Sequence, residues 1–313
     1  MAAERTGGTP PDPQPVERIT EITLDRENVF TREEAALGLI PYRLANGLHG
    51  VTKASFIRKQ LLFAEGEPLD PEILYETERA LRRLGIFRGV AVKSEGGHVT
   101  VETQDAWTLL PRLSFSSRGG VVTYDFGLTD ANFLGTGRQF GVRWAREADR
   151  ISKSIYFQDP QFLRPYTFLT VRLEDLTDGE ATVFGLDRPF YELRTKYAAR
   201  ALYSRTSKET TLYGGGDTVA KWRTSDKEAL LEGGLALSSD SSRAYRAYAF
   251  AHFVDTVLEP GSYGPPPPPG DPRRFFFVGL GLEREGRRWI KVRQADRLDR
   301  DEDFNLAPSF RLD

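Results

Sequence analysis

From residue 106 to its last residue the chain alternates apolar and polar side chains with a period of two. In the clearest segment Val122, Tyr124, Phe126 and Leu128 share one face, and the polar residues between them share the other. The segments are about 8 to 12 residues long, whereas strands of soluble proteins average about 5 or 6. A tilted strand that crosses a bilayer needs about 9 to 11 residues. The pattern therefore predicts an all-β, antiparallel transmembrane barrel.

Roughly ten segments carry this pattern. They lie near 109–116, 122–129, 139–144, 151–158, 166–176, 195–205, 228–238, 245–256, 274–284 and 303–312. Pro111 interrupts the first of them and removes a backbone donor, which favours weak pairing at that strand. The loop Gly261–Gly270 contains five consecutive prolines and cannot form a strand, so we expect it among the outward-facing loops.

Residues 16–105 have a different pattern, which predicts a small α+β domain. Residues 16–24 read as a strand, 56–63 as a helix, and 86–92 and 98–103 as a hairpin. Asp70 and Pro71 predict the start of a second helix, and Gly85 its end. The apolar face of that helix comprises Ile73, Leu74, Thr77, Leu81 and Leu84. We expect its charged residues, Glu72, Glu76, Arg79, Arg82 and Arg83, to lie outside the packed face.

Two further segments lie outside these helices and strands. Residues 1–15 are rich in Gly, Pro and Thr and predict a disordered leader. Residues 25–52 form an insertion between the first strand and the first helix, in which Thr31–Glu34 resembles a capping box. The expected division is thus a leader at 1–15, a domain at 16–105 with its insertion, and a barrel at 106–313.

Composition excludes several classes of function. The 313 residues include no cysteine, which rules out thiol catalysis and thiolate metal sites. The formal net charge of −2 gives no electrostatic case for a nucleic-acid partner. No two of the three histidines are close in sequence, so no histidine metal site is indicated.

The α+β segment resembles a POTRA domain. The resemblance rests on Glu65-Gly-Glu-Pro-Leu-Asp70 and on Leu81-Arg-Arg-Leu-Gly-Ile-Phe-Arg-Gly-Val90, which match the family's helix ends and second strand in order and spacing. Later in the chain, Leu128-Thr-Asp-Ala-Asn-Phe-Leu-Gly-Thr-Gly137 resembles the turn after the second barrel strand of BamA-like proteins. Asp159-Pro-Gln-Phe162 resembles the same family's turn after the fourth strand. Together these motifs indicate the BamA/TamA-like superfamily, in which POTRA domains precede a bacterial surface antigen barrel.

The resemblance implies an outer-membrane protein that assembles or translocates other proteins, with the POTRA domain in the periplasm. It implies no cofactor and no nucleotide. Its partners would be unfolded or extended client outer-membrane proteins, periplasmic accessory proteins and membrane lipid. The POTRA domain would bind a client segment by adding it to the free edge of strand 16–24 or of strand 86–92.

Two alternatives stay open. One is a two-partner-secretion pore that exports a soluble client, and the other is a soluble all-β binding module behind a small α+β domain. A third interpretation, that Gly135-Thr-Gly-Arg138 cradles a phosphate, is weak because no helix follows it.

No residue is predicted to be catalytic, to bind a cofactor or to bind a metal. His49 is expected in a turn or at the surface, and His252 in the barrel wall without a partnered serine. Asp130, Asn132 and Asp159 are expected to form turns by accepting hydrogen bonds from nearby backbone groups.

The length of the chain also leads to an expectation. The resemblance implies sixteen barrel strands, whereas residues 106–313 accommodate about ten. We therefore expect that further coding sequence follows Asp313 and adds the remaining strands. No signal peptide is recognisable at the first residues.

Overall fold

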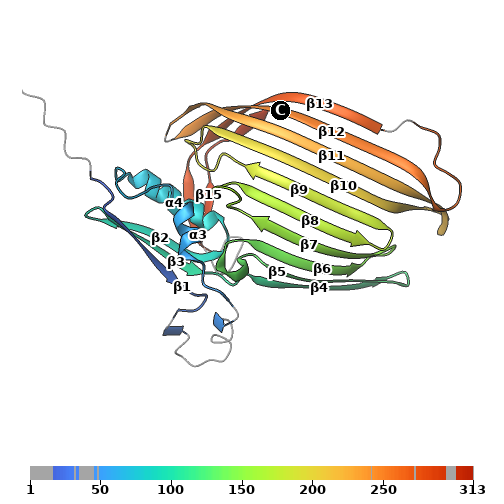
Figure 1. Cartoon of the computed structure of the whole chain (residues 1–313), viewed down its shortest axis with the longest axis horizontal. Coiled ribbons are helices and arrows are strands. Elements are labelled where there is room, and N and C mark those ends of the chain that lie inside the picture. Colours follow the sequence, from blue (N-terminus) through green and yellow to red (C-terminus); the bar gives the residue numbers. More distant parts are fainter. Residues whose placement is uncertain are drawn as a thin grey trace, which may run out of the picture.

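The computed structural model describes residues 17–31, 33–34, 46–47, 49–240, 242–270, 273–293 and 301–312. The chain forms a small βααββ unit followed by a large curved antiparallel sheet (Figure 1). This order of elements confirms the predicted fold class. The expected leader, 1–15, lies outside the described residues.

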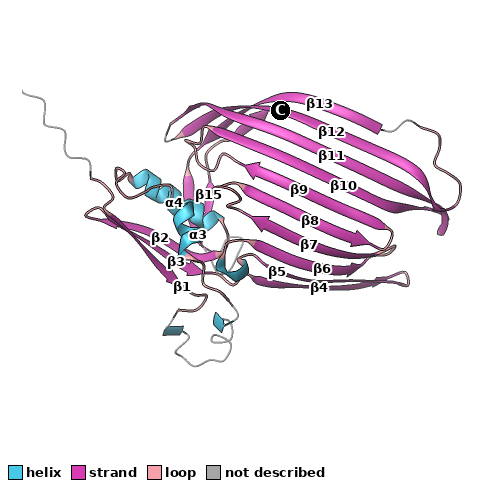
Figure 2. Cartoon of the chain, viewed as in Figure 1, coloured by secondary structure: helices cyan, strands magenta, loops and turns pink. Residues whose placement is uncertain are grey.

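The βααββ unit has one three-stranded sheet with two helices on one face (Figure 2). Strand β3 lies in the centre, parallel to β1 and antiparallel to β2. The elements are β1 (Glu21–Glu27), α3 (Ala54–Gln60), α4 (Pro71–Arg83), β2 (Phe87–Glu95) and β3 (His98–Asp105). Because β3 is central, β1 and β2 are both edge strands.

The expected start and stop residues of these elements act as predicted. The Asp70 carboxylate accepts a hydrogen bond from the Glu72 N–H at 2.9 Å and caps α4, with Pro71 in its first turn. Gly85 follows the helix at φ 69°. The β2–β3 turn places Gly96 and Gly97 at φ 57° and 80°, the left-handed geometry of a tight hairpin turn.

The core of the unit lies between the helices and the sheet. Ile57, Leu81, Val99 and Val101 are fully buried, and Phe87 is 2% exposed. Strand β3 alternates half-buried and buried residues along its whole length, and Val99 and Val101 of its buried face belong to this core. Truncation of such a buried side chain to alanine costs about 2 to 5 kcal/mol.

The large sheet has eleven strands in the order β16-β13-β12-β11-β10-β9-β8-β7-β6-β5-β4. Its strands are β4 (Leu109–Arg118), β5 (Val121–Asp130), β6 (Gln139–Arg146), β7 (Ile151–Asp159), β8 (Phe168–Leu176), β9 (Gly179–Arg188), β10 (Tyr197–Gly214), β11 (Asp217–Ser239), β12 (Arg243–Tyr263), β13 (Arg273–Gly286) and β16 (Phe310–Leu312). A 3-10 turn, η1 (Phe133–Gly135), follows β5. Within the described residues, β4 and β16 remain the two ends of the sheet.

Four strands, β9 to β12, differ from the prediction. Strand β9 was missed, because apolar residues such as Val183 and Phe184 fall on both of its faces and hide the alternation. Strands β10, β11 and β12 have 18, 23 and 21 residues, well beyond their predicted ends, and β12 includes Gly261–Tyr263, which were predicted to lie in the proline-rich loop. The extra residues are mostly polar, so they lacked the apolar signal.

The predicted strand 303–312 is divided. Its first part belongs to β15 (Asp301–Asn305), which forms a separate two-stranded hairpin with β14 (Trp289–Arg293). Only Phe310–Leu312 joins the large sheet. Pro308 lies in the break, where a residue without an N–H ends the ladder.

The two faces of the large sheet differ in chemistry. One, here called the apolar face, exposes large side chains such as Leu113, Phe115, Phe276 and Leu280, the last 80% exposed. The other, the polar face, carries ion pairs. Arg311 on β16 reaches Glu232 on β11 at 2.8 Å across two intervening strands, which places the polar face on the concave side.

Candidate functional site

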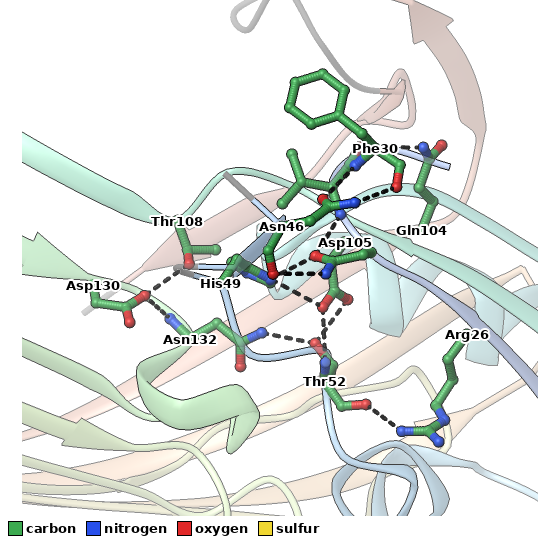
Figure 3. Close-up of polar contacts among 12 residues, drawn as sticks. Arg26, Phe30, Asn46, His49, Thr52, Gln104, Asp105, Thr108, Asp130 and Asn132 are labelled. Carbon is green, nitrogen blue, oxygen red and sulfur yellow. Dashed lines mark hydrogen bonds and ion pairs between the residues drawn. The ribbon is translucent and has the colours of Figure 1, made fainter. Parts of the chain in front are cut away.

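The two parts of the molecule meet where the turn after β5 contacts the segment before α3 (Figure 3). Asn132, 2% exposed, is the central residue of this junction. Its amide nitrogen donates to Thr52 Oγ1 at 2.7 Å, and its amide oxygen accepts from the Gly137 N–H at 2.8 Å. The Lys53 N–H donates to the Gly135 carbonyl at 2.8 Å. Asn132 therefore shapes its own turn and also joins that turn to the βααββ unit.

Asp105 continues this network from the last residue of β3. Its two carboxylate oxygens accept from the Thr52 N–H at 2.7 Å and the Thr52 hydroxyl at 2.8 Å. The side chain is almost fully buried, and that loss of hydration raises the pKa of Asp105 to about 6. A chain of hydrogen bonds thus runs from Asp105 through Thr52 to Asn132. It links the last strand of the βααββ unit to the large sheet, called the wall from here on.

His49 lies in a bend of the same junction and is buried, so of the two expectations, a turn or the surface, the surface one was wrong. It is 9% exposed, and its Nδ1 lies 3.1 Å from Asn28 Oδ1 and 3.7 Å from Asp105 Oδ2. Burial lowers the pKa of His49, which favours the neutral imidazole. Its neighbours come from distant parts of the chain, so sequence spacing gave no sign of them.

The glycines of the turn are required by close packing. A Cβ on Gly135 would lie 2.4 Å from the Val51 carbonyl oxygen, and one on Gly137 would lie 2.0 Å from a ring carbon of Phe56. Both glycines also have φ of +67°. The Gly135–Gly137 loop is filled by its own chain, which leaves the phosphate-cradle interpretation without an open cradle.

The predicted turn-forming acids make the expected backbone contacts. Asp130 Oδ1 accepts from the Asn132 N–H at 3.0 Å and from the Thr108 hydroxyl at 2.7 Å. Asp159 Oδ1 accepts from the Gln161 N–H at 2.9 Å, and its other oxygen pairs with Arg138 at 2.8 Å. In the insertion, the Thr31 and Glu34 side chains bond each other's N–H groups as a capping box does.

The charged face of α4 was expected outside, but much of it is buried. Glu76, Arg79 and Arg82 are 5%, 3% and 7% exposed. The cause is the β14–β15 hairpin, which packs against α4 (Figure 2). Arg82 donates to both carboxylate oxygens of Asp303 at 2.8 Å, and the Arg79 guanidinium lies 4.0 Å from the centre of the Trp289 ring. Sequence gave no signal for contacts between residues this far apart.

The two edges of the small sheet are not equally open. The outer side of β1 is occupied near Ile22, whose N–H donates to Glu65 Oε1 at 3.3 Å and whose carbonyl accepts from Arg58 at 3.4 Å. Further toward the N-terminus, the Ile19 N–H and carbonyl both bond the Gly66–Glu67 backbone. The beginning of this edge, from Ile19 to Ile22, is therefore already satisfied.

Strand β2 has the longer open edge. Glu95 and His98 flank a two-residue turn and form a hydrogen-bonded pair, and such pairs alternate along an antiparallel ladder. The backbone groups of Val90, Val92 and Ser94 therefore face away from β3. Within the described residues, one side chain, that of Glu78, bonds this edge, at the Val92 N–H.

Strand β4, at one end of the large sheet, is the second open edge. Nine of its ten residues are exposed. Arg118 and Val121 flank the two-residue turn to β5, so the same alternation directs the Pro111 nitrogen away from β5. Pro111 thus leaves the β4–β5 ladder intact and removes a donor from the free edge, which weakens pairing on that side only.

The described residues offer no group of three or more acidic or histidine side chains that could hold a metal ion. His252 Nε2 lies 2.8 Å from Glu228 Oε1 on the polar face of the wall. Helices within the described ranges are all too short or too polar to span a membrane.

No family model matches the chain, and no curated protein matches it. Solved structures similar to the chain include the following two. BamA from Haemophilus ducreyi lacking POTRA domains 1–3 is 13% identical over 90% of this chain and 69% of its own, with a TM-score of 0.39. CdiB from Acinetobacter baumannii is 10% identical over 87% of this chain and 43% of its own, with a TM-score of 0.35. The first bears the name of the family that the sequence motifs resemble.

Proposed function

We propose that the chain is a non-enzymatic outer-membrane assembly or translocation protein of the BamA-like type. Residues 16–105 act as a POTRA domain in the periplasm, and residues 106–313 act as a membrane-embedded wall that supports insertion or translocation. The observation that carries this proposal is an open β-strand edge on a small domain that is hydrogen-bonded to a wall with an apolar outer face. The POTRA and BamA-like sequence motifs support it.

Capture of a client occurs at β2. An extended client segment placed beside Val90, Val92 and Ser94 would add a fourth strand to the sheet and satisfy main-chain donors and acceptors without reading a sequence. Strand β1 is less suited, because side chains and the Gly66–Glu67 backbone already occupy its outer side near Ile22. We therefore place capture at β2 rather than at β1, the other edge that the sequence left open.

The wall meets lipid with its apolar face. Leu113, Phe126, Leu231 and Phe276 lie on this face from one end of the sheet to the other, and each is at least 43% exposed. A contiguous apolar surface of this extent is unfavourable in water and suits the hydrocarbon core of a bilayer. The junction then holds the β2 edge near the end of the wall at which clients would arrive.

The test places the full chain in phosphatidylethanolamine–phosphatidylglycerol liposomes with a urea-unfolded eight-stranded outer-membrane barrel protein as the probe. A photo-crosslinking amino acid at Lys93 on β2 should label the probe, and one at Glu21 on β1 should label it several-fold less. Ser94→Pro removes an outward N–H without touching the β2–β3 ladder and should lower the Lys93 yield, whereas Ser94→Ala should not.

Two results would contradict the proposal. Equal labelling from Lys93 and Glu21 would show that β2 is not the capture edge. Folding of the probe at the same rate in liposomes with and without the protein would remove the assembly role. Release of a soluble client through the wall, with no effect on the probe, would instead favour the secretion-pore alternative.

A further inference from the structure

The open edge of β2 is blocked at its centre by one carboxylate. The Val92 N–H, which faces away from β3, donates to Glu78 Oε2 of α4 at 3.1 Å. Charged side chains placed over a strand edge are a known way to prevent unwanted pairing. A strand that adds to β2 needs this same N–H for one of its own carbonyl groups, so it competes directly with Glu78.

Glu78 is itself held by side chains that connect it to the wall. Its other oxygen pairs with Arg82 and lies 3.9 Å from Lys291 Nζ on β14. Arg82 in turn donates to both oxygens of Asp303 on β15 at 2.8 Å. The Arg82 and Asp303 side chains are only 4% and 8% exposed, so water screens this pairing weakly.

We propose that Glu78 is a guard residue for client capture, and that the β14–β15 hairpin controls it through Asp303 and Arg82. With the hairpin docked on α4, Glu78 is held over the Val92 N–H and the edge is closed at its middle. When the hairpin leaves α4, Arg82 loses its bidentate partner, Glu78 is freed, and the edge accepts a strand. The capture part of this inference rests on the proposed function. The series of contacts from Asp303 through Arg82 and Glu78 to the Val92 N–H does not.

The first experiment measures amide hydrogen exchange at Val92 in the full chain in detergent micelles, with no client. Loss of a hydrogen bond to a charged group should speed exchange about tenfold in Glu78→Ala. Asp303→Asn keeps the size of its side chain, lies far from Val92 in sequence, and should speed exchange by a smaller factor. Glu72→Ala, an exposed carboxylate deletion on the same helix, should leave the rate within about twofold.

The second experiment repeats the Lys93 crosslinking to the unfolded barrel probe in these variants. Glu78→Ala and Asp303→Asn should raise the yield above that of the unaltered protein, and Glu72→Ala should match it. Glu78→Gln, which keeps an acceptor but loses the charge paired with Arg82, should fall between Glu78→Ala and the unaltered protein.

The outcomes separate the two proposals. Unchanged Val92 exchange in Glu78→Ala overturns the guard, whatever the crosslinking shows. Faster exchange in Glu78→Ala but not in Asp303→Asn overturns control by the hairpin. Faster exchange in both variants with no crosslinking in any of them supports the guard contact and contradicts capture at β2.

Discussion

At the scale of single residues, Asn132 joins the two parts of the molecule. It bonds Thr52 on one side of the junction and Gly137 on the other, and it is buried. Asn132→Ala would leave the buried Gly137 N–H unsatisfied, at about 1 to 3 kcal/mol, and would remove the bond to Thr52, whose hydroxyl still donates to Asp105. We expect a lower thermal unfolding midpoint in detergent. Asp240→Ala, an exposed turn variant, is the control, and an equal shift in both would contradict a special role for Asn132.

The raised pKa of Asp105 leads to a prediction about how the stability of the protein depends on pH. Its pKa is about 6 in the folded protein against 3.8 as the ordinary value, because burial disfavours the charge. The folded state therefore binds the proton more tightly, and stability should fall as pH rises from about 4 to about 6. The full effect is on the order of 3 kcal/mol, since each pKa unit is worth about 1.4 kcal/mol.

The comparison with Asp105→Asn isolates this effect from that of His49. The lowered pKa of His49 has the opposite sign, because its protonation in the unfolded chain costs stability as pH falls below about 6.5. Asp105→Asn keeps the histidine. The stability difference between the original protein and this variant should therefore grow as pH is lowered from 7 to 4. A difference independent of pH would show that Asp105 does not titrate in this range.

The roles of residues could be predicted where their contacts are with groups close by in the sequence. Asp70, Gly85, Asp130 and Asp159 act on backbone groups a few positions away, so their roles could be read from the sequence. The burial of His49 could not, because its partners Asn28 and Asp105 are set by how the insertion folds back.

At the scale of elements, β2 depends on Phe87. This ring is 2% exposed in the core shared with Leu81 and Val99. Phe87→Asp would place an unpaired carboxylate there, at a cost of several kcal/mol, and should unfold the βααββ unit. Limited proteolysis of the full chain should then cut within residues 54–105 and spare the wall. A protected, cooperatively folded variant would show that the core face of β2 is assigned incorrectly.

Elements were predictable where one face is apolar and the other polar. Strands β5 and β3 show this and were found, whereas β9, with apolar residues on both faces, was missed. The charged residues of α4 were misplaced for a related reason. Periodicity identifies the apolar face, but it does not show that a hairpin some two hundred residues later will cover the charged face.

At the scale of the whole molecule, the apolar face predicts behaviour in solvent. Side chains such as Phe115 and Leu280 are 73% and 80% exposed and would meet water in buffer. We expect the full chain to be insoluble without detergent and to become extractable and monodisperse with it. A monodisperse preparation in plain buffer would contradict the membrane location and favour the soluble binding module.

The three long strands also set how far the molecule reaches. Strand β9 pairs with β10 only as far as Ser207, so the remaining residues of β10, with β11 and β12, continue past the neighbouring wall at the end away from the βααββ unit. A strand of 23 residues at ~3.4 Å each and a tilt of ~45° rises roughly 55 Å, against a hydrocarbon core of ~30 Å. With the wall in an outer membrane, as proposed, the excess of roughly 25 Å would extend this ribbon beyond the bilayer on the outer side. The loop after β12, with its five consecutive prolines, lies along this ribbon at Trp222 and would be among the parts that antibodies, phages and neighbouring cells meet.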